Sequence, residues 1–223
     1  MKMGIKIDCI SDCHGFLPDD LSGGDILIVG GDLTARDQLH EYQEFCVWLH
    51  NQDYRCKIVI AGNHDNDLQK EPFIFEGAIT NAFYLCDSGT EFEGFKIWGS
   101  PWTKTFEGIN PQCKAFTVDT EEELSKKWEL IPKDTDILIT HSPAYGILDG
   151  IEVLYDGTMF YAGSHTLRNK LEEIKPKLFV CGHIHEGYGK LLLKHEGPNT
   201  WCVNSSRVNR RYRPVNAPMR IEL

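Results

Sequence analysis

The sequence lacks the segments that would carry the chain into or across a membrane. No positively charged start is followed by an apolar stretch, so the pattern of a secretory signal peptide is missing. No apolar run approaches the roughly 20 residues that a membrane-spanning helix needs. We therefore expect a cytoplasmic protein that has no membrane among its partners.

Closely spaced cysteine pairs and an excess of basic residues are missing as well. The eight cysteines are scattered, none forms a C-x-x-C pair, and several stand inside apolar runs, which is typical of reduced thiols. The net charge of -10 disfavours a protein that binds nucleic acid through its phosphates, although it leaves room for a local basic patch. We therefore expect no nucleic acid among the partners.

The pattern of secondary structure predicts an α/β fold in one domain, residues 1–223. No linker, low-complexity segment or longer repeat divides the chain. Strands and helices alternate in the first half, and hairpins are expected at 91–98 and 190–203, which favours mixed sheets flanked by helices. Further predicted strands cover 5–11, 25–30, 56–61, 82–86, 137–140, 177–181 and 217–223. A short helix and loop are expected over 67–80.

Three helices are predicted from capping residues followed by an apolar stripe. Thr34 is expected to cap the first, with its buried stripe on Leu39, Tyr42, Cys46 and Leu49. Thr120 and Glu123 form a capping box for the second, and Ser164 caps the third. The segments 101–118, 144–163 and 205–216 are interpreted as loops.

Metal-binding side chains directly follow five of the predicted strands. The candidate ligands are Asp12, His14, Asp32, Asn63, His141, His183 and His185. In an extended chain alternate residues face the same side, so Asp12 and His14 are expected to converge. Imidazole and carboxylate together suit Mn, Fe, Zn, Co or Ni better than Ca or Mg. The sequence thus predicts a transition-metal site at one edge of a sheet.

These ligands are too many for one ion, and a carboxylate shared between two ions about 3.5–4 Å apart accounts for them. Such a pair presents hydroxide near neutral pH and holds phosphate oxygens. His64 follows a ligand directly and is needed by neither ion, so it is free to act as general acid, with Asp65 as its orienting partner. The expected reaction is the hydrolysis of a phosphoester by a hydroxide that bridges the ions.

The strand-end motifs resemble the signature blocks of the calcineurin-like metallophosphoesterase superfamily. These blocks are Asp12-Cys13-His14, Gly31-Asp32, Gly62-Asn63-His64-Asp65, His141 and Gly182-His183-Ile184-His185. Further stretches, 140–143 and 185–189, resemble the metallophosphoesterase-domain-containing branch, which is similar to class III cyclic nucleotide phosphodiesterases.

The resemblance implies a four-layer αββα sandwich with a dinuclear metal centre. It assigns Asp12, His14, Asp32 and His185 to the first ion. It assigns Asp32, Asn63, His141 and His183 to the second ion, and the acid role to His64. We expect phosphodiesterase activity on a small phosphoester such as a nucleotide, with Mn as an activator in vitro. A phosphatase, a nuclease and a non-catalytic metal-binding scaffold on the same fold remain alternatives.

Contacts to the substrate are less well defined by the sequence. Arg36 and Asn63 are the candidates for binding the substrate phosphate. The arginines of segment 205–216 either face an anionic substrate or belong to a solvated loop. The aromatic residues of segment 101–118 either stack on a base or cover the core. The native metals and the oligomeric state, a dimer included, stay open.

Overall fold

The computed structural model describes residues 4–71, 82–106, 111–153 and 155–223. Residues 72–80 of the predicted segment 67–80 lie outside these ranges. The first sheet has the order β15-β1-β2-β3-β4, and the second has the order β13-β14-β12-β9-β6-β5. Both are mixed, because β15, β13 and β5 pair antiparallel with neighbours in otherwise parallel sheets.

The strands of the first sheet are β1 (Lys6–Ile10), β2 (Gly24–Gly30), β3 (Tyr54–Ile60), β4 (Ala82–Tyr84) and β15 (Met219–Glu222). Those of the second are β5 (Ser88–Phe92), β6 (Phe95–Ser100), β9 (Ile137–Thr140), β12 (Leu178–Cys181), β13 (Gly189–Leu193) and β14 (Thr200–Asn204). The helices are α1 (Leu39–His50), α2 (Asn66–Lys70), α3 (Glu121–Trp128) and α4 (His165–Ile174).

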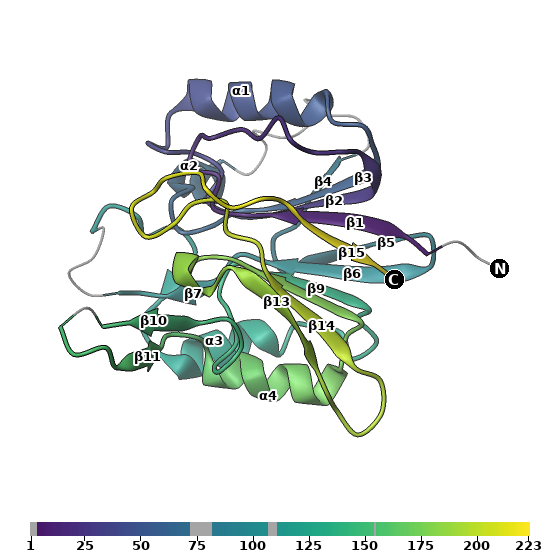
Figure 1. Ribbon diagram of the computed structural model, residues 1–223, viewed down its shortest axis with the longest axis vertical. Coiled ribbons are helices and arrows are strands. Elements are labelled where there is room, and N and C mark those ends of the chain that lie inside the picture. Colours follow the sequence, from purple (N-terminus) through teal and green to yellow (C-terminus); the bar gives the residue numbers. More distant parts are fainter. Residues whose placement is uncertain (1–3, 72–81, 107–110, 154) are drawn as a thin grey trace.

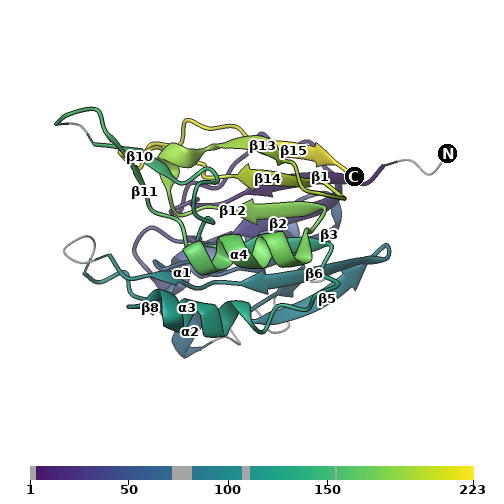
Figure 2. The ribbon, with the colours of Figure 1, turned by 90° about the horizontal axis from the view of Figure 1, so that it is seen from below.

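The two sheets face each other, and helices cover their outer faces (Figure 1). Figure 2 shows α3 and α4 side by side across the second sheet. Buried apolar residues form one layer between the sheets, which includes Ile28 and Val180. A second layer lies under α1 with Phe45, and a third lies under α3 and α4 with Leu171. The expected αββα sandwich is therefore confirmed.

The apolar strands explain where the functional side chains gather. β2, β9 and β12 are buried on both faces, which is typical of parallel strands covered on each side. β1, β2 and β3 run parallel in the first sheet, and β9 and β12 run parallel in the second. The carboxyl ends of these strands consequently meet at one edge of the sandwich (Figure 1).

The start of α1 differs from the prediction. Its N-cap is Gln38, whose backbone N–H donates to Glu41, and Leu39 is 58% exposed. The buried stripe contains Phe45, between Tyr42 and Leu49, instead of Cys46. The physical reason lies in Thr34, which contacts the carboxylate of Asp65, so the chain wraps that group before the helix begins.

Two of the predicted loops contain short paired strands. In segment 101–118, β7 (Thr103–Lys104) pairs with β8 (Thr117–Val118), and residues 107–110 lie outside the described ranges. In segment 144–163, β10 (Gly150–Glu152) and β11 (Met159–Tyr161) form an antiparallel pair. Strands of two or three residues leave too little alternation for the sequence pattern to reveal them.

Within the described parts of the chain, no helix combines the length and the apolar character that crossing a membrane demands.

The other two predicted helices begin where expected, since Thr120 and Ser164 each accept a hydrogen bond from the backbone N–H three residues later.

We predict that Leu171→Ala lowers the free energy of unfolding by about 2–5 kcal/mol. Leu171 is fully buried on the inner face of α4, and its truncation leaves a cavity against the second sheet. Leu192→Ala is the matched control, because Leu192 is 40% exposed; its cost should stay below about 1 kcal/mol. Urea unfolding of the metal-free protein measures both values, and equal costs would contradict the packing described for α4.

Candidate metal centre

The candidate ligands leave their strands through an uncommon backbone conformation. Asp12, His14, Asp32 and His183 all have positive φ angles, between 43° and 68°. Such angles are unfavourable for residues with a side chain and persist where the surroundings enforce them. Asp12 and His14 therefore approach each other through a tight turn, whereas the sequence suggested an extended chain.

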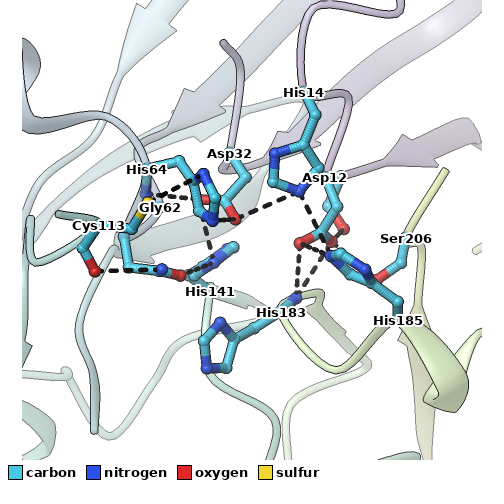
Figure 3. A network of polar contacts seen from close by, with 12 residues as sticks. Asp12, His14, Asp32, Gly62, His64, Cys113, His141, His183, His185 and Ser206 are labelled. Carbon is cyan, nitrogen blue, oxygen red and sulfur yellow. Dashed lines mark hydrogen bonds and ion pairs between the residues drawn. The ribbon is translucent and has the colours of Figure 1, made fainter. Parts of the chain in front are cut away.

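Asp32 lies at the middle of the cluster with its two oxygens facing different histidines (Figure 3). Its Oδ2 is 3.6 Å from His14 Nε2, and its Oδ1 is 3.4 Å from His141 Nε2. The carboxylate is 2% exposed, and its Oδ1 also accepts a hydrogen bond from the backbone N–H of His64 at 2.9 Å. This arrangement is the one that a carboxylate shared by two ions requires.

Asp12, His14 and His185 form one group on one side of Asp32. Their possible ligand atoms all lie within 4.8 Å of one another. The two Nε2 atoms of His14 and His185 are 3.3 Å apart, and His185 Nε2 is 3.4 Å from Asp12 Oδ1. Asp12 is held in place by the backbone N–H of His183 at 3.0 Å.

His141 and Asn63 lie on the other side of Asp32. His141 Nε2 is 3.1 Å from Asn63 Oδ1, which is a neutral carbonyl oxygen. The ring of His183 is further away, with its centroid 5.0 Å from that of His141. His183 belongs to no candidate ligand group among the described residues, although its buried Nε2 has no hydrogen-bond partner there.

Several observations show that these residues fit divalent metal ions. His141 Nδ1 is 2.9 Å from the carbonyl of Gly30, and His185 Nδ1 is 3.3 Å from that of Asn209. Donation from each Nδ1–H to a carbonyl leaves the Nε2 lone pair free for a metal, as in many metal-binding histidines. The orphaned Nε2 of His183 is a further acceptor that a cation would satisfy.

The electrostatics of the cluster favour bound cations as well. Burial alone would raise the pKa of Asp32, but the neighbouring His141 and His64 hold this pKa well below its usual range. Burial lowers the pKa of His14 to about 4 and that of His183 to about 3, so both imidazoles are neutral ligands at pH 7. For His141 the nearby Asp32 outweighs burial and raises the pKa to about 9. The same negative charge that favours a proton on His141 also favours a metal ion at this place.

His64 and Asp65 do not form the expected pair. The carboxylate of Asp65 accepts hydrogen bonds from the backbone N–H groups of Gly62 at 2.8 Å and Leu33 at 3.1 Å. It thereby ties the loop after β3 to the loop after β2. The His64 Nδ1 atom instead lies 3.3 Å from Cys113 Sγ, and its Nε2 lies 3.9 Å from Asp32 Oδ2.

Two glycines of the motifs are explained by close approach to the carboxylates. A Cβ at Gly62 would lie 2.2 Å from Asp32 Oδ1, and one at Gly182 would lie 2.3 Å from Asp12 Oδ2.

Ser206, which the sequence analysis did not single out, donates a hydrogen bond from its hydroxyl to Asp12 Oδ2 at 2.7 Å. Its position just after β14 was the available signal, since β14 also ends at this edge. No pattern pointed to Cys113.

A cleft of about 400 Å³ opens onto the cluster. Its wall combines expected site residues with residues of the three segments that the sequence analysis interpreted as loops. It is lined by Asp32, Asn63, His64, Lys104, Phe106, Cys113, Lys114, Ile151, His183, His185, Arg210 and Tyr212, among others. Arg36 is exposed before α1 and is not among the lining residues that the structure describes, so its expected contact with substrate finds no support.

The aromatic residues of segment 101–118 divide between the two roles considered for them. Phe106 lines the cleft, with its ring centroid 5.4 Å from that of His183. Trp102 and Phe116 pack edge-to-face at 5.7 Å and belong to the apolar layers.

Comparison with known proteins gives consistent relationships. A model of the calcineurin-like phosphoesterase family matches residues 5–187. Metallophosphoesterase domain-containing protein 1 of Homo sapiens is 37% identical over 240 residues, covering 96% of this chain and 70% of that protein.

Two solved structures share the fold. The structure of TT1561 of Thermus thermophilus matches with a TM-score of 0.58 and 16% identity, covering 98% of this chain and 99% of that one. Purple acid phosphatase PPD1 from yellow lupin seeds matches with a TM-score of 0.53 and 11% identity, covering 99% of this chain and 48% of that one. At such low identity these likenesses concern the fold alone.

We predict that Asp32→Asn impairs the binding of both metal ions, because the lost charge faces both groups of ligands. The wild-type chain should retain two Mn²⁺ per molecule after gel filtration, measured by elemental analysis, and the variant fewer than one. Asp19→Asn is the control, since Asp19 is exposed. Retention of two tightly bound ions by the Asp32 variant would contradict a shared carboxylate.

Proposed function

Because the chain belongs to the calcineurin-like phosphoesterase family, and is thereby a metal-dependent phosphoric ester hydrolase, we propose that it cleaves phosphodiesters. The shape of the cleft is the observation that supports this specificity. At about 400 Å³, with Phe106, Ile151 and Tyr212 in its wall, it has room for organic groups on both sides of a phosphate. A phosphomonoester carries only one organic group and would contact less of this apolar surface.

We assign the two ions to the ligand sets that share Asp32. Asp12, His14 and His185 complete the first set, and Asn63, His141 and His183 complete the second. When bound, two divalent ions supply a nucleophile from water at neutral pH and offset the charge of the phosphate oxygens. The mixture of imidazole and carboxylate ligands supports Mn or another transition metal.

His64 is proposed as the general acid. It lines the cleft, and its Nδ1 atom is held by Cys113 Sγ. Its Nε2 atom is 3.9 Å from Asp32 and so stands beside the place where the phosphate would lie. From that position His64 would donate a proton from Nε2 to the leaving-group oxygen, which avoids the release of an alkoxide. Asp65 contributes by positioning the loop that carries Asn63 and His64.

We further propose that the protein acts in the cytoplasm on a small soluble phosphoester. All eight cysteines are free, and burial raises the pKa of each thiol above its usual range, as expected of structural thiols in a reducing compartment.

Mn²⁺-dependent hydrolysis of bis-p-nitrophenyl phosphate is expected to exceed that of p-nitrophenyl phosphate in kcat/KM. Release of p-nitrophenol measures both reactions, and Asp32→Asn should abolish both. A preference for the monoester would identify a phosphatase instead. Absence of turnover with two bound Mn²⁺ ions would favour the non-catalytic scaffold.

His64→Ala should lower kcat for diesters by about 10²–10⁴-fold while Mn²⁺ binding is retained. The loss should be larger for the phenyl ester of thymidine 5′-phosphate than for its p-nitrophenyl ester, because phenolate is the poorer leaving group and needs the proton more. His50→Ala, at an exposed histidine of α1, is the control. Equal losses with both leaving groups would argue against the acid role.

A further inference from the structure

The arginines of this acidic chain fall into two kinds. Four of them form ion pairs with carboxylates, namely Arg55, Arg168, Arg207 and Arg220. The other four, Arg36, Arg210, Arg211 and Arg213, are exposed and form none with the carboxylates that the structure describes. Arg36 lies apart from the others, before α1, whereas Arg210, Arg211 and Arg213 belong to one loop. Three exposed guanidinium groups on one loop attract anions and can bind phosphate oxygens.

These three arginines line a second hollow of about 560 Å³, which we call the arginine hollow. It also contacts Glu152 of β10 and Glu186, which follows His185. Arg210 and Glu186 line the cleft of the metal centre too, so the two spaces adjoin. Three guanidinium groups against two carboxylates leave the arginine hollow with a positive charge.

The loop that carries the arginines is held in a defined shape beside the metal centre. Asn209 Oδ1 accepts hydrogen bonds from the backbone N–H groups of Arg211 at 2.9 Å and Arg213 at 3.2 Å. The carbonyl of Asn209 faces His185 Nδ1, and the ring of Tyr212 lies 5.1 Å from that of His185. The backbone of this loop is thus positioned relative to a metal ligand before any substrate binds, which reduces the part of the entropic cost that comes from ordering the loop.

We infer that the arginine hollow binds a second phosphate group of the substrate, so that the natural substrate is a phosphodiester with a further phosphate on one of its organic groups. This inference rests on the proposed phosphodiesterase function. Guanidinium groups bind phosphate oxygens through paired hydrogen bonds, which suits three adjacent arginines. A diester without a second charge would fill the cleft and leave these arginines without a partner.

The test compares two substrates that differ only by one phosphate: the p-nitrophenyl ester of thymidine 5′-phosphate, with and without a 3′-phosphate. The 3′-phosphate should lower KM by about tenfold, equal to 1.4 kcal/mol. The double variant Arg211→Gln/Arg213→Gln should reduce this ratio of KM values to about one. Lys6→Gln/Lys194→Gln, which removes two exposed charges remote from the hollow, should keep the ratio.

A binding measurement checks the same inference without turnover. By calorimetry, thymidine 3′,5′-bisphosphate should bind the Mn²⁺-loaded protein about tenfold more tightly than thymidine 5′-phosphate, and the double arginine variant should lose this difference. Variants at exposed arginines are expected to fold, and circular dichroism verifies this.

Each contrary outcome has a separate meaning. Equal KM values for both esters would overturn the inference and leave the phosphodiesterase function intact. A preference that survives in the double arginine variant would overturn the assignment to the arginine hollow. Faster cleavage of a thymidine octanucleotide than of either ester would indicate that the substrate is a nucleic acid and would overturn the inference of a small substrate. Failure to hydrolyse any diester would overturn the proposed function, and the inference with it.

Discussion

The burial of two carboxylates side by side is the constraint on which the rest of the site depends. Asp12 and Asp32 are 0% and 2% exposed, and a buried charge is tolerated only where hydrogen bonds or opposite charges surround it. The chain meets this need with backbone N–H groups of His64 and His183, with the hydroxyl of Ser206 and with histidine rings. Positive φ angles at four candidate ligands bring these groups together, and bound divalent cations would complete the compensation.

The framework of this site could be predicted from the sequence because it rests on strong local patterns. Buried strands such as Ile137–Thr140 are continuous apolar runs, and each strand of the site is followed, directly or after one or two small residues, by a side chain with metal-binding chemistry. Parallel pairing then places the strand ends at one edge, so Asp32 and His141 meet although they stand far apart in the sequence. The capping box of α3 and the β5–β6 hairpin were equally predictable.

What the sequence could not predict depends on contacts between distant loops. Asp65 was expected beside His64, but its carboxylate binds the backbone of two loops, and that contact also moved the start of α1. Cys113 approaches His64 from a segment without periodicity. Arg36 was a candidate for binding phosphate but is not part of the described cleft wall, while Arg210 reaches the cleft from a turn in which Asn209 accepts backbone hydrogen bonds.

The position of the metal centre at the seam of the sandwich also bears on how the protein folds. Asp12, His14, Asp32 and Asn63 come from the first sheet, whereas His141, His183 and His185 come from the second. An ion that takes ligands from both sets is a cross-link between the two sheets. The complete coordination shell can exist only after the sheets have docked, so a bound ion would stabilise the docked arrangement of the two sheets.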